Sequence, residues 1–243
     1  MMIRAMSMAA VAAAAMAAAS PAGAVTYDAF TSFNGTPGAG GFLWGTSANV
    51  NSGIVQFTVN TNCVIAGSVC LQDSAAGGNA SLPGIYKSST PSFQYGTVNV
   101  PDDRLLVHPG DDTRMVHIAH QIDTTGSYLL TGEFSVQDIN PTGVNIGYFV
   151  APGGSLPYTL TPITQLNSGN LTFSFSQLIT LNAGDFVGLS LDNAGNFSND
   201  STGINFTIAS VPEASTWAMM IVGVGAAGGA VRRRTARQVA LAA

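Results

Sequence analysis

Apolar and polar residues alternate along several short stretches in the second half of this chain, and this alternation constrains the fold more than any other feature. In 127–136, apolar side chains or glycine take the even positions and mostly polar residues take the odd ones. The same period of two recurs in 144–150, 171–176 and 204–208. Successive side chains of a β-strand point to opposite faces of the sheet, so each stretch predicts a strand with one buried face and one wet face.

Turn sequences rich in Asn, Gly, Pro and Asp separate these stretches. Further strands are expected at 54–59, 95–100, 114–120, 179–181 and 186–191. Helical spacing of apolar residues is nearly absent outside the two ends of the chain. Many short strands with no helices between them favour an all-β fold in which antiparallel sheets pack as a β-sandwich, jelly-roll-like in its strand order. We expect this domain to span 25–210.

The first 24 residues predict a secretory signal peptide with a helical apolar centre. Arg4 supplies the positive start, an apolar run follows at 8–19, and small residues close the segment. Ala22 and Ala24 form the A-x-A pattern that signal peptidase cleaves. The mature chain is therefore expected to begin at Val25. The alternative is an Ala-rich N-terminal helix that belongs to the folded domain.

Near the other end, 217–231 is an uninterrupted run of apolar residues and glycine, followed by Arg232, Arg233 and Arg234. A helix needs about 20 apolar residues to span a bilayer, so this run predicts a short transmembrane helix that is helped by its flanks. Arginines stay on the cytoplasmic side, which makes 235–243 a cytoplasmic tail and leaves the main domain outside. The alternative is a buried helix of the main domain.

The order of parts in this C-terminal segment resembles the PEP-CTERM sorting signal, in its variant with a Trp-Ala pair. Pro212, Glu213, Trp217 and Ala218 match the pattern, and the apolar run and the arginine cluster follow them. Ala214 stands where the family has a second proline. The resemblance, which covers 211–234, implies a protein of Gram-negative bacteria that is exported, anchored transiently in the inner membrane and processed by an exosortase. Such proteins are typical of cells that make extracellular polysaccharide.

Residues 94–210 also resemble the carbohydrate-binding-module-like jelly-roll domain that is common in PEP-CTERM proteins. The segments that carry this likeness are 106–110, 125–134, 181–185 and 196–203. The resemblance implies that polysaccharide is the partner of the domain. Residues 25–93 are expected to supply the first strands of the same sandwich together with long loops.

Basic residues are scarce in the expected domain. The whole chain has 8 Lys and Arg against 13 Asp and Glu, and five of the arginines lie in the two end segments. Only Lys87, Arg104 and Arg114 remain in 25–210, where twelve acidic residues oppose them, so the domain has a formal charge of −9. A strongly acidic surface is unfavourable for nucleic acid and for anionic lipid, so we expect no nucleic-acid partner.

The chain has two cysteines, Cys63 and Cys70. In an oxidising compartment outside the cytosol, such a pair predicts a disulfide that closes a short loop. The alternative is a zinc site, which the scattered histidines do not favour.

Asp111, Asp112 and Asp200 are the candidate metal ligands, because carboxylates on loops suit calcium. Calcium is the one cofactor considered, and no other is expected. The sequence has no EF-hand spacing, and adjacent aspartates are also common as turn and cap residues. His117 and His120 lie at odd spacing on one expected strand, so they point to opposite faces and cannot chelate one ion together.

Aromatic side chains in loops and at strand edges are the candidate ligand contacts. They are Trp44, Tyr86 and Tyr95, with Phe93 and Phe197 as further candidates. For Trp44 the alternative is a place in the core, since an indole buries a large area.

No G-x-S-x-G, H-E-x-x-H or triad-like cluster is present, and Glu133 is the only glutamate of the domain. We therefore expect a non-catalytic protein of the cell envelope, outer surface or extracellular matrix that binds polysaccharide. One alternative is a secreted hydrolase that acts on polysaccharide through two aspartates. Another is a purely structural surface protein.

Overall fold

The computed structural model describes residues 24–73, 83–212, 221–229 and 232. The predicted signal peptide lies outside the described residues, except for Ala24. So do the predicted tail 235–243 and most of the sorting-signal residues, namely Glu213, Trp217, Ala218, Arg233 and Arg234. Residues 221–229 are helical, and no helix in the described part of the chain is long and apolar enough to cross a membrane.

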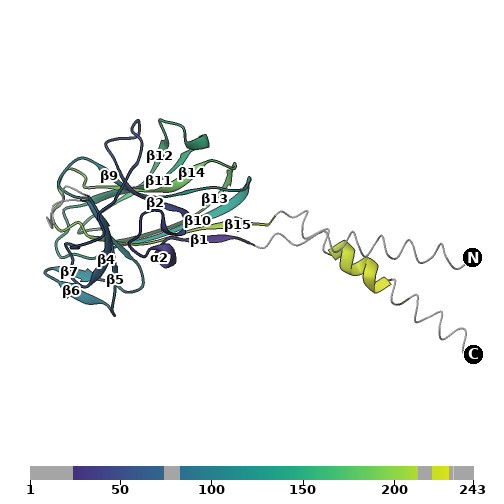
Figure 1. Cartoon of the computed structure of the whole chain (residues 1–243), viewed down its shortest axis with the longest axis horizontal. Helices are drawn as coiled ribbons and strands as arrows, with labels where there is room; N and C mark the ends of the chain where they lie inside the picture. The colour runs from purple at the N-terminus through teal and green to yellow at the C-terminus, as the bar shows by residue number, and fades with distance from the viewer. Residues whose placement is uncertain (1–23, 74–82, 213–220, 230–231, 233–243) are drawn as a thin grey trace, which may run out of the picture. The chain divides into compact units, whose positions relative to one another are not determined.

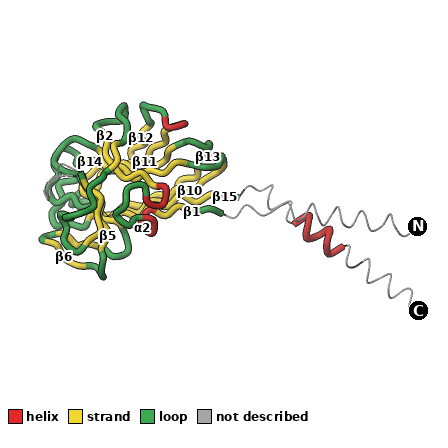
Figure 2. Tube along the Cα trace, viewed as in Figure 1, coloured by secondary structure: helices red, strands yellow, loops and turns green. Residues whose placement is uncertain are grey.

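Thr26–Ser210 forms one compact unit in which two antiparallel sheets face each other, as Figures 1 and 2 show. The first sheet has the order β13 (Thr172–Leu181), β10 (Gly126–Val136), β15 (Thr202–Val211), β8 (Leu105–His108), β5 (Gly84–Ser88) and β4 (Ser68–Gln72), and β1 (Thr26–Asp28) also pairs with β15. The second sheet has the order β12 (Thr159–Leu166), β11 (Val144–Ala151), β14 (Phe186–Asp192), β9 (Met115–Gln121), β2 (Phe42–Ser47) and β3 (Val55–Gln56). A separate hairpin consists of β6 (Phe93–Tyr95) and β7 (Val98–Val100).

The strands from β8 to β15 follow a jelly-roll path. Their order is β8-β15-β10-β13 in one sheet and β9-β14-β11-β12 in the other, so the chain crosses between the sheets at almost every connection. Only β11 and β12 follow each other within one sheet, as an antiparallel hairpin. This order confirms the predicted antiparallel, jelly-roll-like sandwich.

The strands of the N-terminal third widen both sheets of this jelly roll. β2 pairs with β9 in one sheet, and β5 pairs with β8 in the other. Short helical pieces interrupt the loops, namely α2 (Ala29–Ser32), η1 (Ala39–Gly41) and η3 (Pro152–Gly154). The sandwich is thus built from both halves of the domain.

The predicted alternation explains which side chains form the core. Tyr128, Leu130 and Phe134 of β10 are buried between the sheets, whereas Glu133 between them is exposed. Trp44 corrects one prediction, because it is a core residue and not a ligand contact. Its exposed fraction is 0%, and its ring lies 5.0 Å from that of Phe33, measured between centroids. The indole is therefore closed off from solvent in this structure.

Three predictions of strand extent were wrong. The strand expected at 54–59 is only the two-residue β3, and Val59 forms an isolated bridge with Gln72. The two stretches expected at 171–176 and 179–181 form one continuous strand, β13, because pairing with β10 continues through Gln177 and Leu178, where the alternation of burial breaks. The single strand expected at 95–100 is the tight hairpin β6–β7, which turns at Gly96 with a φ of 59°. A positive φ costs glycine little, so the chain reverses there.

A second, smaller core lies on the outer face of the first sheet, where the β6–β7 hairpin covers β5 and β8. Its buried members are Ile65, Cys70, Tyr86, Val100 and Leu106. The predicted disulfide is confirmed, since Cys63 and Cys70 are bonded with an S–S distance of 2.08 Å. The disulfide-closed loop therefore lies in this second core.

Candidate functional site

A cleft of about 430 Å³ opens beside the second core. Its walls come from segments far apart in sequence: the disulfide loop, strands β5 and β8, the β6–β7 hairpin, and the loops that follow β10 and β14. Because paired strands and a disulfide anchor most of these segments, the cleft is largely preformed. A concave site with apolar walls and a few polar groups is the usual form of a small-ligand site.

Aromatic rings form much of the apolar lining of the cleft. Tyr86 on β5 is buried, and burial raises the pKa of its hydroxyl above the ordinary value. Tyr95 at the end of β6 is 37% exposed, and Phe197 in the loop after β14 is half-buried. The structure thus brings together two of the three predicted ligand contacts, Tyr86 and Tyr95, and adds Phe197.

His108, at the end of β8, supplies a neutral polar group to the cleft. Its Nδ1 accepts a hydrogen bond from the backbone N–H of Gly110 at 3.1 Å, so the proton of the neutral ring lies on Nε2. Burial lowers the pKa of His108 to about 4, although the carboxylates of Asp138 and Asp111 act in the opposite direction. At neutral pH the ring is uncharged, and its Nε2 is a hydrogen-bond donor.

Asp200 fixes the loop that carries Phe197. Its carboxylate accepts hydrogen bonds from the backbone N–H groups of Thr142 and Gly143, at 3.0 and 2.8 Å, and from the Thr142 hydroxyl at 3.0 Å. Burial raises the pKa of Asp200, and these donors partly oppose that effect. Asp200, which was predicted as a metal ligand, therefore joins its own loop to the loop that contains Thr142 and Gly143.

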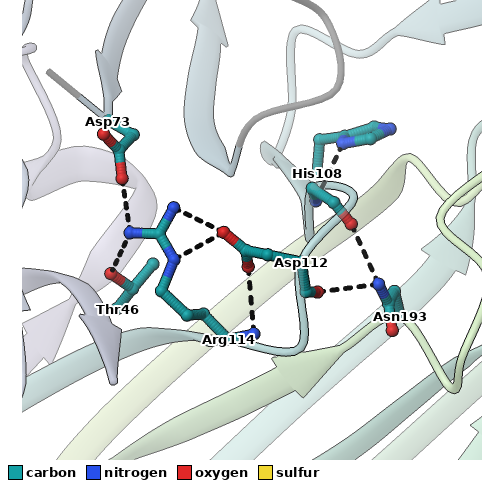
Figure 3. Close-up of polar contacts among 7 residues, drawn as sticks. Thr46, Asp73, His108, Asp112, Arg114 and Asn193 are labelled. Atoms are coloured by element: carbon teal, nitrogen blue, oxygen red, sulfur yellow. Dashed lines mark hydrogen bonds and ion pairs between the residues drawn. The ribbon is translucent and has the colours of Figure 1, made fainter. Parts of the chain in front are cut away.

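Arg114 fixes the segment that follows His108 in the chain, and Figure 3 shows its contacts. Its guanidinium pairs with Asp112 at 2.6 Å and with Asp73 on the other side. The side-chain amide of Asn193 donates to the backbone carbonyls of Gly110 and Asp112, at 3.1 and 2.8 Å. The turn between β8 and β9 is thereby held in place.

These contacts bear on the predicted calcium ligands. Asp112 is engaged with Arg114, and Asp200 is engaged with backbone donors. Within the described residues, no group of three or more His, Cys, Asp or Glu side chains is placed to hold a metal ion. The structure does not bring Asp111, Asp112 and Asp200 together as one such group.

A serine–histidine contact lies elsewhere, in a cluster that sequence reasoning missed. Ser47 Oγ lies 2.7 Å from His117 Nε2, and the Tyr158 hydroxyl lies 3.1 Å from the same serine oxygen. All three side chains are buried, with exposed fractions of 2%, 0% and 3%. A nucleophile and base must be reachable by substrate, and this pair is sealed. The cluster therefore has a structural role in this conformation.

A second hollow of about 310 Å³ lies on the open part of the first sheet. Asp28, Asp103 and Glu133 line it together with threonines, and Phe30 stands beside them. Arg104 already pairs with Asp103 at 2.8 Å. Compared with the cleft, this hollow is more acidic and has fewer aromatic side chains.

Comparison with known proteins adds one decisive observation on the C-terminal segment. Residues 210–234 match the family model of the PEP-CTERM protein-sorting motif. The chain carries a PEP-CTERM sorting motif. This motif indicates an exported protein of a Gram-negative bacterium, and it confirms the resemblance drawn from Pro212, Glu213 and the residues after them.

Several solved structures resemble this chain in part. The K3 cleaved adhesin domain of Lys-gingipain from Porphyromonas gingivalis w83 has 12% identity and a TM-score of 0.36, over 64% of this chain and 98% of the other. A family 29 carbohydrate-binding module has 13% identity and a TM-score of 0.31, over 49% and 78%. The isomalto-dextranase of Arthrobacter globiformis T6 complexed with panose has 13% identity and a TM-score of 0.30, over 65% and 24%. No curated protein sequence matches the chain.

Proposed function

We propose that this PEP-CTERM protein is a non-catalytic component of the cell envelope or extracellular matrix, and that its jelly-roll domain binds polysaccharide in the cleft. The observation that carries the proposal is the cleft itself, which combines the accessible rings of Tyr95 and Phe197 with the polar groups of His108 and Asp138, while the buried ring of Tyr86 lies behind them. Rings pack against the apolar faces of a sugar, and the polar groups bind its hydroxyls.

The sorting motif supports the location of this activity. An exported protein of a Gram-negative bacterium meets polysaccharide outside the cytosol. On this proposal, 1–24 is removed at export and 217–231 anchors the chain transiently in the inner membrane. An exosortase-type enzyme then processes the segment after the domain, and the domain remains at the surface or in the matrix.

The test is binding of the full-length chain, in a detergent without a sugar headgroup, to an array of bacterial polysaccharides and their oligosaccharides. Tyr95→Ala and Phe197→Ala should each weaken binding about tenfold, which corresponds to roughly 1.4 kcal/mol. Phe30→Ala is the matched control, because that ring lies at the second hollow. Loss of binding in the control alone would move the site to that hollow.

The hydrolase alternative makes a different prediction for the same samples. A hydrolase would release new reducing ends from a polysaccharide that it binds, and one Asp→Asn change in the cleft would abolish that release. Among the residues that the structure describes, Asp138 is the only aspartate that lines the cleft. We expect saturable binding without release of reducing ends.

A further inference from the structure

The basic residues of the domain are all engaged away from the cleft. Arg104 pairs with Asp103 at 2.8 Å, and Arg114 pairs with Asp112 and Asp73. Lys87 donates to the backbone carbonyl of Phe30 at 2.6 Å, and its Nζ lies 4.1 Å from the centre of the Phe30 ring. The sequence has no other Lys or Arg between 25 and 210. The cleft therefore offers no cation to a uronate, sulfate or phosphate group.

A carboxylate lines the cleft instead. Asp138 is half-buried and accepts a hydrogen bond from the backbone N–H of Ile139 at 2.9 Å. It takes part in no ion pair within the described residues, which leaves its second oxygen for a ligand. The electrostatic potential at His108 is also negative, because Asp138 and Asp111 both favour a positive charge there. His108 itself is neutral, so no described residue that lines the cleft cancels this potential.

The rings add to the same preference. A cation near the face of an aromatic ring is attracted by the quadrupole of the ring, and Tyr95 and Phe197 both line the cleft. A charged amine can also form a charge-assisted hydrogen bond with a carboxylate, which is stronger than the bond between neutral groups. The formal charge of −9 on the domain attracts a cationic polymer from a distance.

We infer that the cleft selects polysaccharides with free amino groups, such as a hexosamine polymer that is partly or fully unacetylated, and that Asp138 is the residue that binds the amine. This inference rests on the proposed polysaccharide binding and specifies its ligand class. Neutral polymers of the same backbone bind through the rings and hydrogen bonds to their hydroxyls, without the ionic contact to Asp138, and acidic polymers are repelled.

The experiment compares two oligosaccharide series of equal length, glucosamine oligomers and N-acetylglucosamine oligomers, by titration calorimetry at pH 6. The samples are the full-length chain and its variants Asp138→Asn and Glu133→Gln. Both variants remove one negative charge, but Glu133 lies at the second hollow. The native chain and Glu133→Gln should bind the glucosamine oligomer about tenfold more tightly. In Asp138→Asn the two oligomers should bind equally, and raising the salt should weaken the preference in the native chain.

The outcomes separate this inference from the proposed function. Equal binding of both oligomers by the native chain would overturn the amine preference and leave polysaccharide binding standing. A preference that survives in Asp138→Asn would also overturn the assigned role, because long-range charge would then suffice. If neither oligomer, and no other polysaccharide on the array, bound to the native chain, both the inference and the proposed function would fail.

Discussion

The rings of His108 and Phe197 meet edge to face, with centroids 6.2 Å apart and planes at 73°. One ring lies at the end of β8, and the other lies in the loop between β14 and β15. This contact joins the backbone-anchored part of the cleft to its loop wall. The position of Phe197 therefore depends on the contacts that fix its loop. Asp200 provides them by accepting hydrogen bonds from the backbone N–H groups of Thr142 and Gly143.

We expect Asp200→Ala to lower the free energy of unfolding by about 2–3 kcal/mol, because it leaves the buried N–H of Gly143 without an acceptor and removes the hydrogen bonds to Thr142. Polysaccharide binding should weaken as well, since the Phe197 loop loses its tie. Urea unfolding followed by fluorescence measures the first effect. The matched control is Asp102→Ala, at an exposed aspartate, which should change stability by less than about 0.5 kcal/mol. Equal effects at both positions would contradict the role given to Asp200.

The disulfide between Cys63 and Cys70 closes a short loop that contributes Val64 and Ile65 to the cleft. In the chain-entropy account, a loop of this length stabilises the fold by about 2.5 kcal/mol. Reduction should therefore lower Tm by roughly 5–10 °C in a domain of this size. The double variant Cys63→Ser/Cys70→Ser serves as the control, because its Tm should not respond to reductant. An unchanged Tm of the native chain under full reduction would show that the bond does not stabilise the fold.

Acid should destabilise the fold through His117. Burial lowers the pKa of His117 to about 4 in the folded chain, whereas an unfolded chain has a histidine pKa near 6.5. Between these values the unfolded chain binds a proton that the folded one does not, so stability falls as pH decreases from about 6.5 to 4. The loss attributable to this residue is on the order of 3 kcal/mol by pH 4. Denaturant unfolding at several pH values measures it.

His117→Gln removes the titrating group, so the slope of stability against pH should become shallower over that interval. Other groups, including His108, still titrate in the variant and leave part of the slope. A slope identical to that of the native chain would mean that His117 is already protonated in the fold, or that its burial does not matter.

Export should be visible in the mass of the protein recovered from its own cells. We expect the mature chain to begin at Val25, after Ala22 and Ala24. We also expect the protein found outside the cell to lack the residues beyond Pro212. Mass spectrometry of the membrane and extracellular fractions locates both termini. A cytosolic chain that retains Met1 and Ala243 would contradict the proposed route.

Strands with one wet face could be predicted from their alternation, and apolar runs also predicted β9 and β14, but β2, which is covered on both faces, could not be predicted. β10 alternates because Tyr128 and Leu130 enter the core while Glu133 meets solvent. β2 carries no such pattern, since nearly every residue of it is buried, and for that reason the place of Trp44 in the core stayed open. Pairing between distant strands keeps β13 continuous through Gln177, which local periodicity cannot reveal.

The site was predictable only as a set of residue types. Ring chemistry singled out Tyr86, Tyr95 and Phe197, but their convergence depends on β5, the β6–β7 hairpin and a loop after β14 lying side by side. Neither the neutral His108 nor the carboxylate of Asp138 stood out, because their roles come from burial and neighbours rather than from a motif. The pairing of Asp112 with Arg114 was not predicted for a similar reason, since it appears only once the turn is built.

The most direct measurement is a crystal structure of the protein with a bound oligosaccharide from the series that it binds most tightly. We predict that a sugar ring lies in the cleft between Tyr95 and Phe197, with polar contacts to His108 Nε2 and to the carboxylate of Asp138. A sugar found in the hollow beside Glu133, or elsewhere on the open face of the first sheet, would contradict the account.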